Sequence, residues 1–401
     1  MEQEIYNIDD ILKEIEEQAR PQRPRPVAQP DPQRKPSTGK KPAQKKSGLQ
    51  KALGIVGRIM AFLLVTVLLV AVTLYGVMYV LVEGPSPTAR NTFIMSVRET
   101  SAVGFLANIF LTEDEIAQIE SASNQMEVYI DDSSVGITIE KPNPEENSDD
   151  QNQGPKPDQW GLVDEDGDGI IVEKVTGEGY SGYMMVVLDP SRVIMGSVPS
   201  SYGARGYTVA DMVAKFDAVA GINAGGFEDP DGQGNGSIPS TLLVFEGKMY
   251  YEGKGIQDGF VGFDSNFIMH TGKFSPAQIK EKDIQYGVSF GPALINNGVP
   301  EDAKTLTSGI NPRTAIGQRS DGAVLMLVID GRQLISLGAR YTDLVDVFLE
   351  YGAVTACNLD GGSSTLMWYQ GDYINNCASV VGIRPVPTTF LVLKEGVRND
   401  G

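Results

Sequence analysis

A lone carboxylate, two glycines and two hydroxyl residues follow an apolar run near the C-terminal end of the sequence. The stretch reads "CNLDGGSSTLMWYQG" from Cys357, which makes the carboxylate Asp360. An aspartate beside glycines is an ordinary turn composition. The same composition suits a strand end where a ligand approaches the backbone closely and meets a carboxylate. This stretch alone leaves both interpretations open.

Two glycine pairs and one arginine have the chemistry to bind an anion. Gly225 and Gly226 follow "DAVAGINA", and Gly361 and Gly362 follow "GAVTACNLD". Backbone N–H groups at such pairs can bind an anion, although neither stretch matches a P-loop or a dinucleotide-binding fingerprint. Arg313 in "NPRTAIG" offers a guanidinium fork for a phosphate or a carboxylate, or else a surface salt bridge.

The two glycine pairs lie in a weak internal repeat. In both copies, Ala-Val begins an apolar run that reaches an asparagine five residues after the alanine, at Asn223 and at Asn358. Two helix–strand–glycine units would place these asparagines at similar strand ends. Apolar strands also resemble one another by chance, so both explanations stay open.

An acidic stretch, "DEDGDGIIVEKV", resembles the first half of a calcium-binding loop. Asp164, Asp166, Asp168 and Gly169 have the required spacing, but the twelfth position holds Val175 instead of a bidentate glutamate. We therefore expect an acidic turn before a strand at residues 170–174. No metal and no cofactor are predicted.

The composition excludes several classes of function. With 33 Lys and Arg against 52 Asp and Glu, the chain lacks the basic surface that a nucleic-acid partner requires. The single histidine, His270, is too few for a histidine-based zinc site and is expected at the surface. Cys357 and Cys377 permit a disulfide but do not require one.

A long uncharged segment predicts one membrane span. "IMAFLLVTVLLVAVTLYGVMYVLV" covers residues 59–82 and follows a basic, Pro-rich stretch at residues 20–51. The segment is long enough to cross a bilayer as a helix, and it is too long and too deep in the chain for a cleaved signal peptide. The preceding basic residues predict a cytoplasmic N-terminus and an exported segment after Val82.

The sequence divides into five parts with different compositions. An acidic stretch without aliphatic residues, "PNPEENSDDQNQGPKPD", cannot bury enough surface to fold and indicates a linker. The predicted parts are a cytoplasmic basic Pro-rich tail at residues 1–54, a transmembrane helix at 55–82, an extracytoplasmic helical stalk at 83–125, an acidic disordered linker at 126–158 and a folded domain at 159–398. Within the tail, residues 1–19 have the spacing of an amphipathic helix.

The C-terminal part has the pattern of an α+β domain. Short β-rich runs such as "GYMMVVLD", "TLLVFEGKMYY", "GAVLMLVIDG" and "TTFLVLK" are bounded by Gly, Asp or Pro. Thr208 and Asp211 form a capping-box pattern for a helix at residues 208–216. Thr342 and Gly352 bound a second helix at residues 342–351. The expectation is a single mixed-sheet domain with flanking helices.

Six ordered motifs carry a resemblance to a known family. They are "GINAGGF", "SFGPALINNG", "NPRTAIG", "VIDGR", "NLDGGSSTL" and "NNCASVVGIRPV". In order and spacing they resemble the phosphodiester glycosidase family, which includes members associated with bacterial exopolysaccharides. The likeness covers residues 168–394 and does not cover the span, the stalk or the linker.

The resemblance implies hydrolysis of a sugar-1-phosphodiester between the anomeric carbon and the phosphate oxygen. Asp360 is the first choice for the catalytic carboxylate, followed by Asp330 of "VIDGR" and by Glu228. The phosphate leaving group needs little acid catalysis, but it needs a cation and N–H donors. The resemblance places around the pocket Asn223, Gly225, Arg313, Asp360, Gly361, Gly362 and Ser363. We also expect Gly226, Asn358 and Ser364 to bind the substrate.

The sequence departs from the family pattern at two places. Glu228 stands where relatives carry a second aromatic residue, and Asn376 begins "NCAS" where "N-x-P-S" is usual. Both changes concern the identity of the substrate more than the chemistry. Two other functions stay open, namely a catalytically silent glycan-binding module and an enzyme that breaks the phosphorus–oxygen bond of the same substrate.

Overall fold

The computed structural model describes residues 48–98, 103–124, 137–139, 156–228, 236–240, 242–250, 259–304, 306, 308–379 and 382–396. The predicted amphipathic helix at residues 1–19 and most of the predicted linker lie outside these ranges. Two compact units divide the chain at residues 70 and 71. Each is considered by itself.

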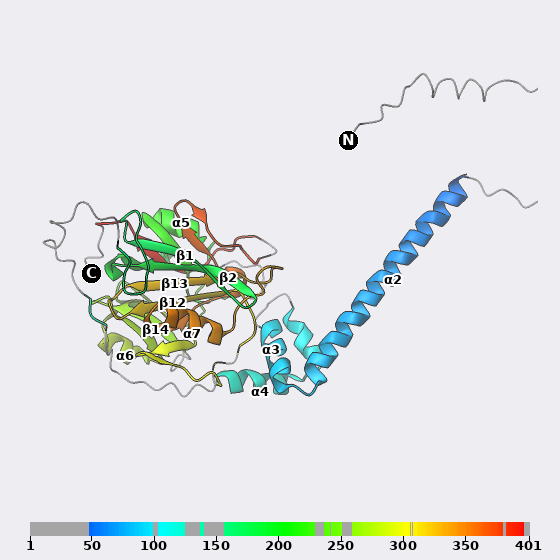
Figure 1. Cartoon of the computed structure of the whole chain (residues 1–401), viewed down its shortest axis with the longest axis horizontal. Coiled ribbons are helices and arrows are strands. Elements are labelled where there is room, and N and C mark those ends of the chain that lie inside the picture. Colours follow the sequence, from blue (N-terminus) through cyan, green and yellow to red (C-terminus); the bar gives the residue numbers. More distant parts are fainter. Residues whose placement is uncertain are drawn as a thin grey trace, which may run out of the picture. The chain divides into compact units, whose positions relative to one another are not determined.

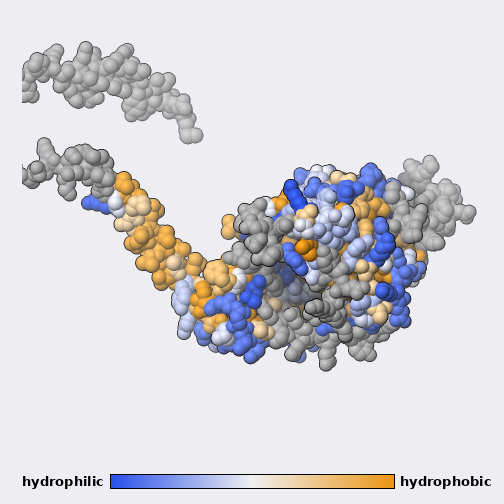
Figure 2. All heavy atoms as spheres, turned by 180° about the vertical axis from the view of Figure 1, so that it is seen from behind, coloured by the Kyte–Doolittle hydropathy of each residue, from blue (hydrophilic) through white to orange (hydrophobic). Residues whose placement is uncertain are grey.

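The N-terminal helix α2 (Gly48–Glu83) contains the predicted span. Its portion Ile55–Glu83 is the one helix in the described residues that is long and apolar enough to cross a membrane. The side chains of this portion are almost all exposed, and Figure 2 shows a hydrophobic surface along the helix. Such a helix is consistent with a signal anchor or a signal sequence.

Three short helical segments follow α2. They are α3 (Pro87–Arg98), the 3₁₀ helix η1 (Gly104–Ile109) and α4 (Glu113–Asn124), and their apolar residues form a small core with Val82. Thr112 Oγ1 accepts a hydrogen bond from the backbone N–H of Glu115, and Glu115 accepts one from that of Thr112, which caps α4. The predicted helical character of residues 83–125 is confirmed where the structure describes them.

The C-terminal domain contains three antiparallel sheets (Figure 1), so the prediction of a single mixed sheet was wrong. In spatial order, the first sheet consists of β1 (Ile170–Gly177), β2 (Tyr180–Val187), β13 (Val324–Ile329), β12 (Arg313–Arg319), β14 (Ala353–Asn358), β10 (Ala293–Asn296) and β11 (Val299–Pro300). The second consists of β16 (Asp372–Tyr373), β15 (Met367–Tyr369), β4 (Ala218–Asn223), β17 (Thr388–Leu393) and β3 (Val193–Ser197). The third consists of β6 (Lys248–Tyr250), β5 (Leu243–Phe245), β9 (Ile284–Val288), β7 (Phe260–Asp264) and β8 (Met269–Gly272).

The central strands of the first sheet are buried on both faces. Along β13, Val324, Met326 and Val328 belong to one apolar cluster, which also contains residues of the other two sheets. The alternate residues Leu325 and Leu327 belong to a second cluster, which includes residues of helix α7 (Tyr341–Glu350). A strand that is covered on both faces has a continuous apolar sequence, and buried parallel strands have the same kind of sequence. Composition therefore did not reveal whether these strands pair in parallel or antiparallel.

Both predicted helices exist, with one different cap. Helix α5 (Val209–Lys215) has the expected capping box between Thr208 and Asp211. Helix α7 begins one residue earlier than predicted, and its N-cap is Arg340, whose backbone N–H donates to Asp343 at 2.7 Å. Gly352 follows the helix with a φ of 77°, as a glycine stop requires. The smaller helices are η2 (Pro190–Arg192), η3 (Pro199–Ser201), α6 (Pro276–Glu281) and η4 (Gly362–Ser364).

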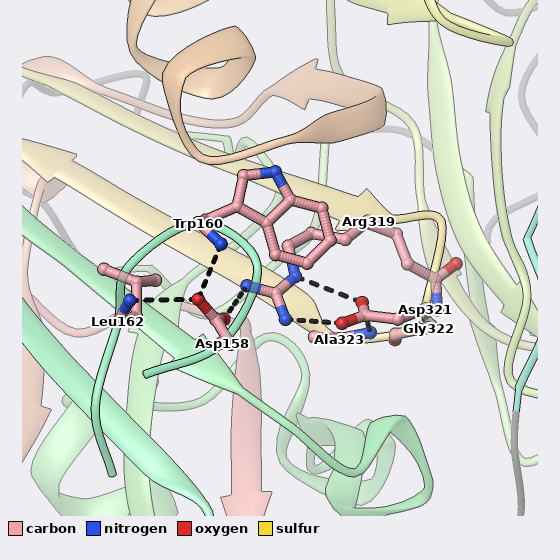
Figure 3. A network of polar contacts seen from close by, with 8 residues as sticks. Asp158, Trp160, Leu162, Arg319, Asp321, Gly322 and Ala323 are labelled. Atoms are coloured by element: carbon pink, nitrogen blue, oxygen red, sulfur yellow. Dashed lines mark hydrogen bonds and ion pairs between the residues drawn. The ribbon is translucent and has the colours of Figure 1, made fainter. Parts of the chain in front are cut away.

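A buried arginine fastens the start of the domain to β12 (Figure 3). The Arg319 side chain is 1% exposed and donates to Asp158 at 2.7 Å and to Asp321 at 2.5 Å. Its guanidinium lies 3.7 Å from the centre of the Trp160 ring. Asp158, which the sequence assigned to the linker, therefore packs onto the folded domain.

The expected position of His270 is corrected, and the described structure contains no bond between the two cysteines, a question that the sequence left open. His270 is largely buried, with its side chain 13% exposed and its Nε2 3.1 Å from Asp264 Oδ2, instead of lying at the surface. Cys357 and Cys377 are free thiols, the first buried and the second partly exposed. Burial raises the pKa of the Cys357 thiol to about 12, which makes it an inert core residue.

Candidate functional site

A cavity of about 240 Å³ opens where β12 begins and β14 ends. Five of the predicted site residues contribute to its wall, namely Arg313, Asn358, Asp360, Gly361 and Gly362. Four residues that the sequence did not single out complete it, namely Phe290, Asn311, Tyr341 and Leu359. The internal repeat explains part of this arrangement, because Asn223 and Asn358 are the last residues of β4 and β14.

Among the described residues that line the cavity, Asp360 alone carries a carboxylate. It accepts hydrogen bonds from the backbone N–H of Gly361 and from the side chain of Ser364. Burial raises the pKa of this carboxyl to about 6, against the lowering effects of those bonds and of the nearby Arg384 charge. A carboxyl that titrates near neutral pH in a cavity has the properties of a catalytic acid or base.

Asn223 positions the backbone of Asp360 from behind the cavity. It is fully buried, and its Nδ2 donates to the carbonyl of Asp360 at 2.5 Å. Its Oδ1 accepts from Thr314 Oγ1 at 2.8 Å and from the N–H of Leu366 at 3.1 Å. The backbone N–H of Asp360 donates in turn to Ala224 at 2.9 Å. Asn223 therefore joins the ends of β4, β12 and β14 and does not line the cavity.

Asn358 brings an unsatisfied acceptor to the cavity. The residue is 1% exposed, and its Nδ2 donates to the carbonyl of Gly291 at 2.8 Å. Its Oδ1 is buried and has no hydrogen-bond partner among the described residues. A buried carbonyl oxygen without a partner is costly, and a donor on a bound ligand would satisfy it.

Arg313 is held rigidly at the cavity wall. Its Nε donates to the carbonyl of Ala339 at 3.1 Å, and one Nη donates to that of Gly309 at 2.7 Å. The guanidinium lies 4.4 Å from the centre of the Tyr341 ring. With the residue only 4% exposed, Arg313 supplies a fixed positive charge more than an open fork.

Two further arginines near the cavity were missed by the sequence reasoning. Arg332 is exposed, and its guanidinium donates to Ser363 Oγ and to Asn311 Oδ1, each at 3.2 Å. Its φ of 57° lies in the left-handed region, where strain often marks a functional position. Arg384 is close enough to Asp360 to lower the pKa of that carboxyl. The motifs "VIDGR" and "GIRPV" contain these residues, and that was the available signal.

The other two predicted carboxylates lie outside the cavity wall. Asp330 is 4% exposed and accepts from Asn375 Nδ2 at 3.2 Å and from the backbone N–H and Nδ2 of Asn376, both at 2.9 Å. It fastens the loop that follows β16. Glu228 is exposed, and only its backbone contact with Ile238, at 2.9 Å, is described.

The glycines act here through close packing. The N–H groups of Gly225 and Gly362 donate to Thr388 Oγ1 and to the carbonyl of Pro312, at 3.0 and 2.9 Å. The N–H of Gly361 donates a hydrogen bond to the carboxylate of Asp360. A Cβ on Gly361 would lie 2.8 Å from the carbonyl oxygen of Pro312. Three of the four expected anion donors are thus used within the protein. A Cβ on Gly226 would approach Ser240 Oγ at 3.0 Å and the Phe290 ring at 3.2 Å.

The acidic stretch before β1 forms the predicted turn. The carboxylates of Asp164, Asp166 and Asp168 offer oxygens within 4.8 Å of one another. They accept hydrogen bonds from backbone N–H groups of the same loop, such as Gly167 and Ile170, at 3.0 and 2.8 Å. Burial and the two neighbouring acids raise the pKa of the Asp168 carboxyl.

Comparisons with known proteins show a family and one relative in sequence. Residues 216–393 match the family model described as phosphodiester glycosidase. The SPbeta prophage-derived uncharacterized protein YomE of Bacillus subtilis (strain 168) is 32% identical over 181 residues, and the match covers 42% of this chain and 27% of that protein's length.

Two solved structures are also similar. The zebrafish N-acetylglucosamine-1-phosphodiester alpha-N-acetylglucosaminidase catalytic domain, auto-inhibited by its pro-peptide, matches with a TM-score of 0.47 and 19% identity over 56% of this chain and 82% of that chain. A hypothetical protein from Synechocystis matches with a TM-score of 0.41 and 15% identity over 57% of this chain and 62% of that chain.

Proposed function

Because residues 216–393 form a phosphodiester glycosidase family domain, we propose that this protein hydrolyses a sugar-1-phosphodiester at the bond between the anomeric carbon and oxygen. The observation that carries the proposal is Asp360, which supplies the one carboxylate among the described residues of the cavity wall and has a pKa raised by burial to about 6. The activity serves envelope or exopolysaccharide metabolism in this proposal.

In the proposed reaction, Asp360 acts in its ionised form. The anomeric carbon–oxygen bond breaks, and its electron pair leaves with the phosphate oxygen as a phosphomonoester. Water supplies a hydroxyl group to the anomeric carbon, and its remaining proton goes to Asp360 and then to solvent or product. Asp360 either removes that proton directly or first forms a glycosyl ester that water then opens. Both routes require the carboxylate, and neither needs a strong acid because the phosphate is a good leaving group.

Three arginines at or near the cavity would stabilise the departing phosphate. Arg313 supplies a fixed buried charge, whereas the exposed Arg332 projects from the neighbouring turn and Arg384 lies near Asp360. Charge stabilisation of this kind acts most strongly where the charge develops in the transition state. The unsatisfied Oδ1 of Asn358 would accept a hydrogen bond from a hydroxyl group of the sugar.

The experiment measures sugar released from a sugar-1-phosphodiester by the full chain in detergent. N-Acetylglucosamine-1-phosphate esters are the first substrates to test. Asp360→Asn preserves the shape and removes the charge, and it should lower turnover by about two orders of magnitude or more. In the parent, kcat/KM should fall about tenfold per pH unit below pH 6, because the required carboxylate becomes protonated.

Matched variants and labelled water separate the alternatives. Glu228→Gln, at an exposed carboxylate, should retain the parent's turnover. In ¹⁸O-labelled water, cleavage at the anomeric carbon places the label in the sugar, whereas cleavage of the phosphorus–oxygen bond places it in the phosphate. If Asp360→Asn hydrolyses the diester as fast as the parent, the assignment of Asp360 is wrong. A parent that binds diesters but cleaves none across sugars and pH values is a glycan-binding module instead.

We also infer that α2 anchors the chain in the cell membrane with its N-terminus in the cytoplasm. The 29-residue apolar portion Ile55–Glu83 supports the anchor, and the basic residues before it support the orientation. The catalytic domain would then act on the extracytoplasmic side.

A further inference from the structure

A turn beside the cavity presents three large aliphatic side chains to solvent. Leu334, Ile335 and Leu337 are 104%, 81% and 58% exposed, more than a folded domain usually allows at neighbouring positions. Elsewhere in the described part of this domain, strongly exposed aliphatic residues are scattered, and the most exposed of these is Val299 at 67%. The three residues together form a convex apolar tip.

The backbone of this tip is held in place and cannot fold its apolar side chains inward. Gln333 and Ser336 exchange backbone hydrogen bonds of 2.9 and 3.2 Å, which close a tight hairpin. The N–H of Leu337 donates to Gly179 at 2.8 Å, and the Ser336 hydroxyl donates to the carbonyl of Asp330 at 2.6 Å. The exposure of Leu334 and Ile335 is therefore built into the fold.

The hairpin also adjoins a residue that lines the cavity. Arg332, at its foot, donates to Ser363 and to Asn311, and Asn311 lines the cavity. On the other side, Ala339 pairs with Asn311 and accepts a hydrogen bond from Arg313. A surface that binds the hairpin tip would thus come close to the cavity entrance.

We propose that residues 333–337 contact a lipid bilayer, with Leu334 and Ile335 among the acyl chains and the exposed Arg340 at the level of anionic headgroups. Three side chains on a convex tip are too few for a second copy of the chain, since a specific interface needs about 800 Å² from each partner. A bilayer needs only a few apolar side chains when the protein is already tethered to it. Arginines complement the negative surface of the lipid. The inference rests on the proposed anchoring by α2.

The test introduces a tryptophan as a probe of depth. Leu334→Trp in the full chain is reconstituted into vesicles of phosphatidylcholine and phosphatidylglycerol, with and without brominated acyl chains. The matched control is Val299→Trp, which puts the same probe at an exposed aliphatic position in another strand. The native Trp160 and Trp368 supply a constant background that the parent protein measures.

Bromination should remove most of the fluorescence added by Leu334→Trp and little of that added by Val299→Trp. Equal quenching of the two probes would overturn the proposal. A second outcome would also overturn it. If brominated lipid does not quench the Leu334→Trp probe and aqueous iodide does not reach it either, the probe is covered by a second copy of the chain or by another protein. If Leu334→Trp does not fold, Ile335→Trp replaces it. Flotation of the parent with vesicles tests the anchor separately, and a chain that does not float overturns both the anchoring and the lipid contact.

Discussion

Replacement of Asp360 by asparagine should stabilise the protein at neutral pH while it abolishes the proposed activity. Burial raises the pKa of this carboxyl from 3.8 to about 6, so the folded state holds the proton more tightly than the unfolded state. The free energy of unfolding of the parent should therefore fall as pH rises between about 4 and 6. Above that window the whole cost of the buried charge is present.

The size of the effect follows from the two pKa values. Their difference corresponds to an upper limit of about 3 kcal/mol, and partial exposure of Asp360 to water reduces the expected gain to about 1–2 kcal/mol. An asparagine at this position has no charge to bury at any pH and retains an acceptor for the N–H of Gly361. The variant should be more stable than the parent at pH 7–8 and similar to it at pH 4.

The assay is thermal unfolding of the detergent-solubilised full chain, followed by tryptophan fluorescence across pH 4–8. Asp372→Asn is the control, because Asp372 is exposed and its loss should leave the pH dependence of the parent intact. An Asp360→Asn variant that is less stable than the parent at pH 7–8, or whose advantage grows toward low pH, would refute the reasoning. The same carboxyl should control the acid limb of activity, so both pH profiles should bend near pH 6.

Two further outcomes test the boundary of the domain and the topology. Arg319→Met should lower the free energy of unfolding by about 3 kcal/mol, because it leaves the carboxylates of Asp158 and Asp321 without their buried cation. The control Arg205→Met, at an exposed position, should change the free energy of unfolding very little. Equal losses in the two variants would contradict this account. Protease added to intact cells should digest residues beyond Val82 and spare the basic N-terminal arm, whereas digestion of the C-terminal domain only after lysis would reverse the orientation.

The local elements of this fold could be predicted from the sequence, but their assembly could not. The capping box of α5 and the glycine stop of α7 depend on neighbouring residues, and local patterns report them faithfully. The pairing of β13 with both β2 and β12 joins segments separated by more than a hundred residues in one case and by a short turn in the other. The sequence of an apolar strand does not identify the strand with which it pairs.

Long-range contacts also distinguish two of the candidate carboxylates, Asp360 and Asp330. Asp360 and Asp330 both follow buried strands and both precede glycine, so their sequence surroundings are nearly alike. What distinguishes them is the loop at residues 375–376, whose amide groups meet Asp330 and leave Asp360 to the cavity. The segment that occupies Asp330 lies outside the local sequence of either carboxylate, so local patterns do not report this contact.

Arg332 combines two roles, because its backbone conformation begins the exposed hairpin and its side chain extends to the cavity. Its left-handed backbone starts the hairpin that carries Leu334 and Ile335, and its side chain turns back to Ser363 beside Asp360. A glycine would adopt this backbone without strain but would provide no cation. A strained arginine at this position is therefore best explained if its charge is needed at the cavity, where the proposed phosphate leaves. The turn that begins at Arg332 presents the apolar tip that is proposed to contact lipid.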